Sequence, residues 1–95
     1  MYSKVYWITC NPGHRDGLLA DYDASVVPAI NASDKHIGHH MVEVDDHKWL
    51  LVSNYVSKEA AEAAVPMVQG LVKPMMDAHG MTLEVIDQGE VIRTI

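Results

Sequence analysis

The segment Lys48–Val56, KWLLVSNYV, has the residue types of a β-strand but no polar face. Because strand side chains alternate, its two faces carry Trp49, Leu51 and Tyr55 on one side and Leu50, Val52 and Val56 on the other. A sheet that is apolar on both faces must be covered on both. In a protein of 95 residues, helices of the same chain can cover one face. A second copy of the chain is then expected on the other face, which predicts a homodimer joined sheet to sheet.

Hydrophobic periodicity divides the chain into four strands and two helical stretches in the order βαββαβ. They are expected at Lys4–Cys10, about His14–Ile30, His36–Val44, Lys48–Val56, Ser57 to about Ala78, and Met81–Ile86. Ser57 is a candidate N-cap, and Pro66 predicts a kink or a new helical piece. A turn is expected at Gln88-Gly89, before a short final extended piece.

This order of elements determines the expected fold. Short connections and right-handed crossovers arrange βαββαβ as a four-stranded antiparallel sheet with both helices on one face. The composition, 48% apolar and 21% charged, fits one globular domain. We therefore expect a single α+β domain over residues 1–95. It is a ferredoxin-like βαββαβ sandwich that dimerises sheet to sheet into an α+β barrel.

Charge and cysteine content narrow the partners. The net charge is −6 and lysines and arginines do not cluster, so a phosphate backbone would be repelled and no nucleic acid is expected. No apolar run approaches the ~20 residues of a membrane span, so no membrane association is expected. The N-terminus lacks a signal-peptide pattern, and Cys10 is the sole cysteine, so no internal disulfide can form. A cytoplasmic protein is the expectation.

The segment His36–Val44, HIGHHMVEV, places three histidines within five positions. On a regular strand His36 and His40 share a face but stand roughly 13 Å apart, at ~3.3 Å per residue. Zinc–nitrogen bonds are about 2 Å long, so this pair cannot bind one ion, and His39 points to the opposite face. We therefore expect no metal site within this strand, and only an ion shared across the dimer, or with His79 or His14, stays open. The chain also has no glycine-rich nucleotide motif, so no cofactor is expected.

Several short segments, spread along almost the whole chain, resemble the dimeric α+β barrel superfamily and its antibiotic-biosynthesis-monooxygenase-like branch. They are Asn11-Pro12-Gly13, VVPAINAS (Val26–Ser33), NYVSKEAAEAA (Asn54–Ala64) and DQGEVI (Asp87–Ile92). They resemble the turn after the first strand, the end of the first helix, the strand-to-helix junction and the C-terminal strand. The order and spacing of these segments match the fold better than any one of them does.

The resemblance implies a dimer with a pocket in each monomer, between sheet and helices or in the barrel. It also implies, as one activity of the superfamily, oxidation of polycyclic aromatics or quinols by molecular oxygen without a cofactor. Other members degrade haem. The Asn, Trp and His set of those members has no counterpart here, which argues against haem chemistry.

Hairpin pairing suggests which residues would serve such a site. Pairing about Asp45 and Lys48 puts His40 opposite Ser53. His40 and the aromatic residues of this hairpin then lie on one face, which would point to the partner subunit or to a pocket. His40 is then the candidate catalytic acid or base, because imidazole titrates nearest neutrality. The candidate substrate-binding residues on or near this face are Trp49, Tyr55, Ser53, His36 and Trp7. A shift of register by one residue would exchange the faces.

Two functions stay open on these residues. The first is a small dimeric, cofactor-independent monooxygenase that acts on an aromatic or quinol. The second is a non-catalytic or stress-associated dimer that binds a small apolar molecule or nothing, with His40 hydrogen-bonded to Ser53 and the aromatic side chains filling the interface. Fold alone does not choose between them.

Overall fold

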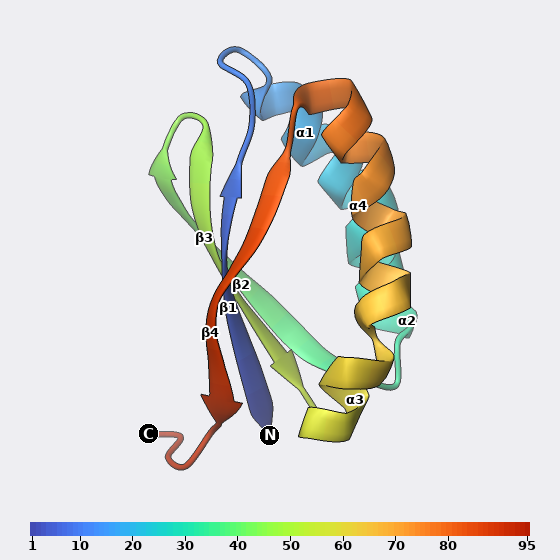
Figure 1. Cartoon of the computed structure of the whole chain (residues 1–95), viewed down its shortest axis with the longest axis vertical. Helices are drawn as coiled ribbons and strands as arrows, with labels where there is room; N and C mark the ends of the chain where they lie inside the picture. The colour runs from blue at the N-terminus through green and yellow to red at the C-terminus, as the bar shows by residue number, and fades with distance from the viewer.

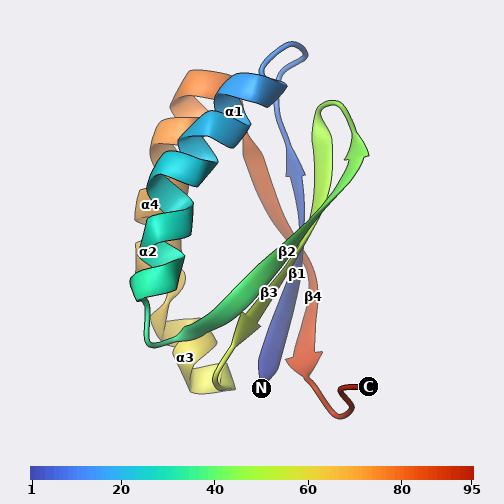
Figure 2. The same cartoon turned by 180° about the vertical axis from the view of Figure 1, so that it is seen from behind.

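The computed structural model of the chain describes residues 1–95. The elements are β1 (Tyr2–Thr9), α1 (Arg15–Asp21), a π-helical turn η1 (Tyr22–Val26), α2 (Val27–Ala32), β2 (His36–Asp45), β3 (Lys48–Tyr55), α3 (Lys58–Ala63), α4 (Val65–His79) and β4 (Thr82–Glu90). The strands form one antiparallel sheet in the order β2-β3-β1-β4. All helices lie against one face of it (Figures 1 and 2). The predicted ferredoxin-like α+β fold is confirmed.

The first helical stretch runs through three consecutive segments without a break. The π-helical turn η1 lies immediately before α2, in which Pro28 occupies the first turn. Proline lacks the N–H that an α-helix needs at that position, and a wider turn accommodates the missing bond. Tyr22, the first residue of η1, is thereby placed with its side chain buried toward the sheet.

The second helical stretch divides where the sequence predicts it. The Ser57 hydroxyl accepts a hydrogen bond of 3.0 Å from the Ala60 N–H and caps α3. Pro66 lies in the first turn of α4, where its missing N–H removes no helical bond. Gly80 ends α4 with φ of 61°, a left-handed conformation that favours glycine. None of the helices combines the length and apolar character needed to cross a bilayer.

The predicted turn at Gln88-Gly89 is wrong. β4 continues through both residues because they pair with Lys4 and Ser3 of β1. Ile86 has no partner in this ladder and forms a bulge. Pairing with a neighbouring strand has overridden the local turn preference of the Gln-Gly pair.

The predicted pairing of Asp45 with Lys48 is correct, but Val44 is unpaired in β2. This bulge shifts the rest of the hairpin by one residue, so His39, not His40, stands opposite Ser53. The predicted His40–Ser53 pair is therefore wrong.

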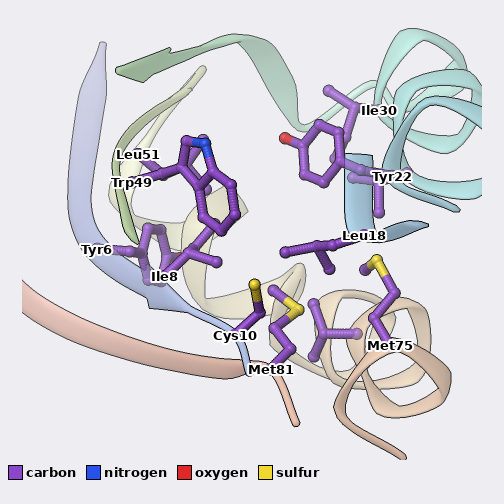
Figure 3. Close-up of a cluster of buried hydrophobic side chains, with 12 residues drawn as sticks. Tyr6, Ile8, Cys10, Leu18, Tyr22, Ile30, Trp49, Leu51, Met75 and Met81 are labelled. Atoms are coloured by element: carbon purple, nitrogen blue, oxygen red, sulfur yellow. The ribbon is translucent and has the colours of Figure 1, made fainter. Parts of the chain in front are cut away.

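The predicted choice of sheet face is also wrong. Trp49, Leu51, Ser53 and Tyr55 point under the helices and are all buried, and they do not face outward. The main hydrophobic core lies between the sheet and the helices. It consists of Tyr6, Ile8, Cys10, Leu18, Tyr22, Val26, Ile30, Trp49, Leu51, Val72, Met75 and Met81. Figure 3 shows the strand and helix side chains meeting in this layer. The aromatic face was the better choice for the core because aromatic side chains bury the larger apolar area.

Candidate functional site

A cavity of about 260 Å³ lies between the β1–β4 side of the sheet and the helices α3 and α4. Its wall is mostly aliphatic, formed by Ala61, Val65, Val68, Val72, Met76, Leu83 and Val85, with Lys4, Tyr6, Tyr55 and Gln69 as its polar members. Val65, Gln69, Met76 and Val85 are exposed, so the cavity reaches solvent beside the edge strand β4. An apolar cavity of about 150 Å³ holds benzene, so this one can hold a molecule of one or two rings.

A smaller cavity of about 30 Å³ continues into the core. The two cavities share Tyr6, Tyr55, Val68, Val72 and Leu83 in their walls. The smaller one adds Ser53, His39 and Tyr22. A space of this size admits one or two small atoms, and here they would meet polar side chains.

Two tyrosine hydroxyls meet where the cavities join. The oxygens of Tyr6 and Tyr55 lie 3.2 Å apart, and both residues are buried. Only one of the two hydroxyls can donate to the other, so one O–H remains free to donate to a ligand. Burial raises the pKa of Tyr6 far above its usual value, with the contact to Tyr55 adding to it. Tyr6 is therefore a neutral hydrogen-bond donor at physiological pH.

His39 and Tyr22 form a second polar pair beside the inner cavity. The Tyr22 hydroxyl lies 2.7 Å from Nδ1 of His39, and Nε2 of His39 is buried without a partner. Burial, followed by the neighbouring charge of His36, lowers the pKa of His39 to about 4. Burial raises the pKa of Tyr22 to about 12. Both groups are neutral at physiological pH, so they can offer hydrogen bonds but His39 is a weak base.

Strand irregularity explains why His36 and His39 point to the same side. Ile37 has no partner in β3, and Gly38 adopts φ of 150°, a conformation that L-residues rarely take. The bulge brings the two imidazole rings to 5.7 Å between centroids, although the residues are three positions apart in the sequence. The prediction that His36 and His39 lie on opposite faces is therefore wrong. His36 is buried, accepts or donates a 2.9 Å bond with the Ser33 hydroxyl, and packs on Tyr55.

Lys4 is the one lysine in the wall of either cavity. It is 8% exposed, and its ammonium group makes no salt bridge and no side-chain hydrogen bond. Its Nζ lies 6.0 Å from the centre of the Tyr55 ring. The Nζ atom keeps some contact with solvent, and an unpaired cation beside an apolar wall favours a ligand that brings the opposite charge.

The structure divides the predicted site residues between two faces. Tyr55 and Ser53 line the cavities, and His36 lies beside Tyr55. Trp49 is buried in the core at 2% exposed and lines no cavity. His40 and Trp7 lie on the open face of the sheet. The structure therefore does not bring His40 together with Trp49, Ser53 and Tyr55.

Sequence reasoning missed Lys4, Tyr6, Tyr22 and His39 as cavity residues. Of these residues, only Lys4 has a sequence pattern that could have indicated its position in the cavity. It occupies a buried position in the strict alternation of β1, where Tyr2, Tyr6 and Ile8 also point inward. A lysine at such a position is uncommon and indicates a specific role.

One group of side chains has the spacing of a metal site. Ligand atoms of Asp45, Asp46 and His47 lie within 4.8 Å of one another at the hairpin turn. The group is at the surface, and its histidine is held by Asp46 at 2.7 Å. Exposed acidic groups of this kind are common without an ion, so we assign no metal to them.

Solved structures with this architecture are numerous, although no protein-family model and no curated protein matches the sequence. A protein from Deinococcus radiodurans, provisionally named an antibiotic biosynthesis monooxygenase, aligns with a TM-score of 0.79 at 13% identity over 100% of this chain and 96% of its own. The chain has an antibiotic-biosynthesis-monooxygenase-like fold.

Two further structures align over nearly the same extent. A protein of unknown function from Nitrosomonas europaea has a TM-score of 0.76 and 12% identity, with 99% of this chain and 91% of that chain covered. A dimeric ferredoxin-like protein from an uncultured marine organism has a TM-score of 0.75 and 14% identity, with 99% and 96% covered. Sequence identities this low show similarity of fold only, so the function has to be argued from the residues of the site.

Proposed function

We propose that the chain is a small dimeric, cofactor-independent monooxygenase that oxidises an aromatic or quinol molecule. The observation that carries the proposal is the apolar cavity beside the Tyr6–Tyr55 hydroxyl pair. The monooxygenase name of the Deinococcus structure with the same fold supports it. In this proposal the substrate ring lies among the aliphatic side chains of α4, and a ring oxygen accepts a hydrogen bond from the free tyrosine O–H.

The reaction balances with molecular oxygen as the only co-reactant. One atom of O₂ becomes a new hydroxyl on the ring of the quinol, and the ring is oxidised to the quinone. The other oxygen atom takes two hydrogens and leaves as water. The substrate supplies all the electrons, so the protein has only to bind it, favour its electron-rich form and exclude water.

The proposed dimer would cover the open face of the sheet. Val5 stands opposite Val52, and Trp7 and Val42 both stand opposite Leu50, so apolar side chains run across three strands. None of the helices covers this face (Figure 2). A continuous apolar surface of this kind is typical of an interface. The marine structure of the same fold carries the description dimeric, which supports the proposal.

The catalytic role of His40 stays a prediction and belongs to the open face. In a sheet-to-sheet dimer His40 and Trp7 would lie between the two sheets, and a site there would be separate from the cavity under the helices. A matched set of variants distinguishes the two locations. Tyr6→Phe removes a cavity hydroxyl, His40→Ala alters the open face, and Tyr2→Phe removes a buried hydroxyl that bonds Gln88 outside the cavity walls.

Oxygen uptake with a panel of naphthohydroquinones and anthrones tests the proposed function. We expect uptake above the uncatalysed rate, and incorporation of ¹⁸O from ¹⁸O₂ into the product. Tyr6→Phe should lower kcat/KM by about tenfold or more, the usual cost of a lost hydrogen bond to a reacting group, and Tyr2→Phe should not. Loss of uptake in His40→Ala with Tyr6→Phe unaffected would place the site between the sheets.

One observation favours binding without catalysis as the second candidate. The cavity contains no group that is a strong base at neutral pH, because the pKa of His39 is held near 4 by burial. A protein that binds the same aromatics but consumes no oxygen with any of them would have this second function.

A further inference from the structure

Lys4 is 8% exposed, and its ammonium group has no counter-ion within the chain. The sequence has 13 acidic residues against 7 basic ones, yet none of the carboxylates pairs with Lys4. The other polar side chains in the cavity wall are the tyrosines Tyr6 and Tyr55 and the amide Gln69, so no carboxylate lines the cavity. Across the β1–β4 ladder Lys4 faces Gln88, a second amide, whose side-chain oxygen accepts from Tyr2.

None of the other six lysines and arginines lines either cavity, and Lys58 and Arg93 are exposed to solvent without a carboxylate partner. Arg15, Lys35 and Lys73 each contact a carboxylate at the surface. Lys48 lies over the ring of Trp7 at 4.2 Å on the open face. Among the lysines and arginines, Lys4 alone lines the apolar cavity, whose volume suits one or two rings. An unpaired cation at the wall of an apolar cavity is available to an anion that enters the cavity, which makes it an anion subsite.

We propose that Lys4 selects, for the cavity, an aromatic ligand that carries one anionic oxygen, a carboxylate or an ionised phenol. The rings would lie against Val68, Val72 and Leu83, and the anionic oxygen would meet the Lys4 ammonium and the free hydroxyl of the Tyr6–Tyr55 pair. The inference deepens the proposed function and rests on it for the location of the ligand. The Lys4 ammonium would also favour the ionised, electron-rich form of a phenol substrate, because a nearby cation lowers the pKa of a phenol. No catalytic base would then be needed in the cavity.

Binding of 2-naphthoate and of its neutral isostere 2-naphthamide, measured by calorimetry, tests the selection. We expect the wild-type protein to bind the carboxylate at least tenfold more tightly, the scale of one charge-assisted hydrogen bond. Lys4→Met should bring the ratio of the two dissociation constants close to one. Lys48→Met, which removes a cation from the open face, should leave the ratio unchanged. A thermal melt of each variant checks that it is folded, and Lys4→Gln replaces Lys4→Met if that variant unfolds.

A spectral titration of 4-nitrophenol distinguishes the two anionic oxygens, because the ionised form alone absorbs near 400 nm. If the subsite accepts phenolates, wild-type protein will increase this absorbance at pH 6 and Lys4→Met will not. An increase would assign phenolates, and binding of naphthoate without an increase would assign carboxylates. Equal binding of naphthoate and naphthamide by the wild type, no binding of either, or a preference that survives both Lys4 variants would overturn the inference.

The outcomes separate this inference from the proposed function, because naphthoate is not oxidised. Anion preference with no oxygen uptake from any quinol would remove the oxygenase function and keep the Lys4 subsite. Oxygen uptake with neutral quinols and no anion preference would do the reverse.

Discussion

Acidification should destabilise the fold through His39, the half-buried imidazole that contacts Tyr22. Its pKa is lowered from 6.5 to about 4, first by burial and then by the charge of His36. His39 therefore binds a proton below about pH 6.5 in the unfolded chain, but only below about pH 4 in the folded chain. The contribution to stability is fully present above pH 6.5 and is lost as the pH falls through this window.

The magnitude follows from the shift. A shift of about 2.5 pKa units at about 1.36 kcal/mol per unit gives an upper value of about 3.4 kcal/mol. Partial exposure of His39 to solvent reduces this, and we expect about 2 kcal/mol. The pKa of His36 is also lowered by burial, so acidification of the wild type includes a second, smaller loss in the same direction.

Urea unfolding followed by circular dichroism at pH 7, 6, 5 and 4.5 measures the loss, at one protein concentration because a dimer would make stability depend on it. His39→Gln keeps a polar side chain for Tyr22 but does not titrate, so its stability should fall by about 2 kcal/mol less than that of the wild type over this range. His40→Gln, on the open face, is the matched control and should follow the wild type. Equal losses in His39→Gln and the wild type would refute the reasoning.

Three further changes test other parts of the account. Ser53 is 1% exposed and its hydroxyl has no partner, so Ser53→Ala should leave the free energy of unfolding unchanged or raise it by up to about 1 kcal/mol while weakening aromatic ligands in a calorimetric titration. Gly80→Ala should cost about 1–2 kcal/mol in urea unfolding, because Gly80 has φ of 61° and a Cβ there would meet the Asn11 side chain. Val52→Glu should convert the proposed dimer to monomers in sedimentation velocity, whereas Ile92→Glu, in the tail after β4, should not.

The sequence was enough to predict the order of elements and the cap at Ser57, because each rests on local chemistry: a periodicity, a hydroxyl ahead of a helix, a proline. Register was not predictable, because it depends on single unpaired residues. Val44 and Ile37 carry ordinary strand side chains, and nothing in their identity shows that they will be bulges. Gly38 gave a weak signal, since a glycine inside a strand often marks such a place.

The choice of sheet face failed for a related reason. Both faces of β3 are apolar, so alternation alone could not show which one the helices cover. The candidate site followed from this choice, and His40 was grouped with aromatic residues that lie on the other side of the sheet. The lack of a partner for Lys4 is a tertiary property, because it depends on where every carboxylate of the chain ends up.

The most direct test of the central claim is a crystal structure of the protein with 1,4-naphthoquinone, a stable product analogue of a quinol substrate. The account predicts the two rings between α4 and the β1–β4 side of the sheet, against Val68 and Val72, with a quinone oxygen within hydrogen-bond distance of Tyr6 or Tyr55. Rings bound on the open face beside Trp7 and His40, or a cavity that takes up no ligand, would contradict it.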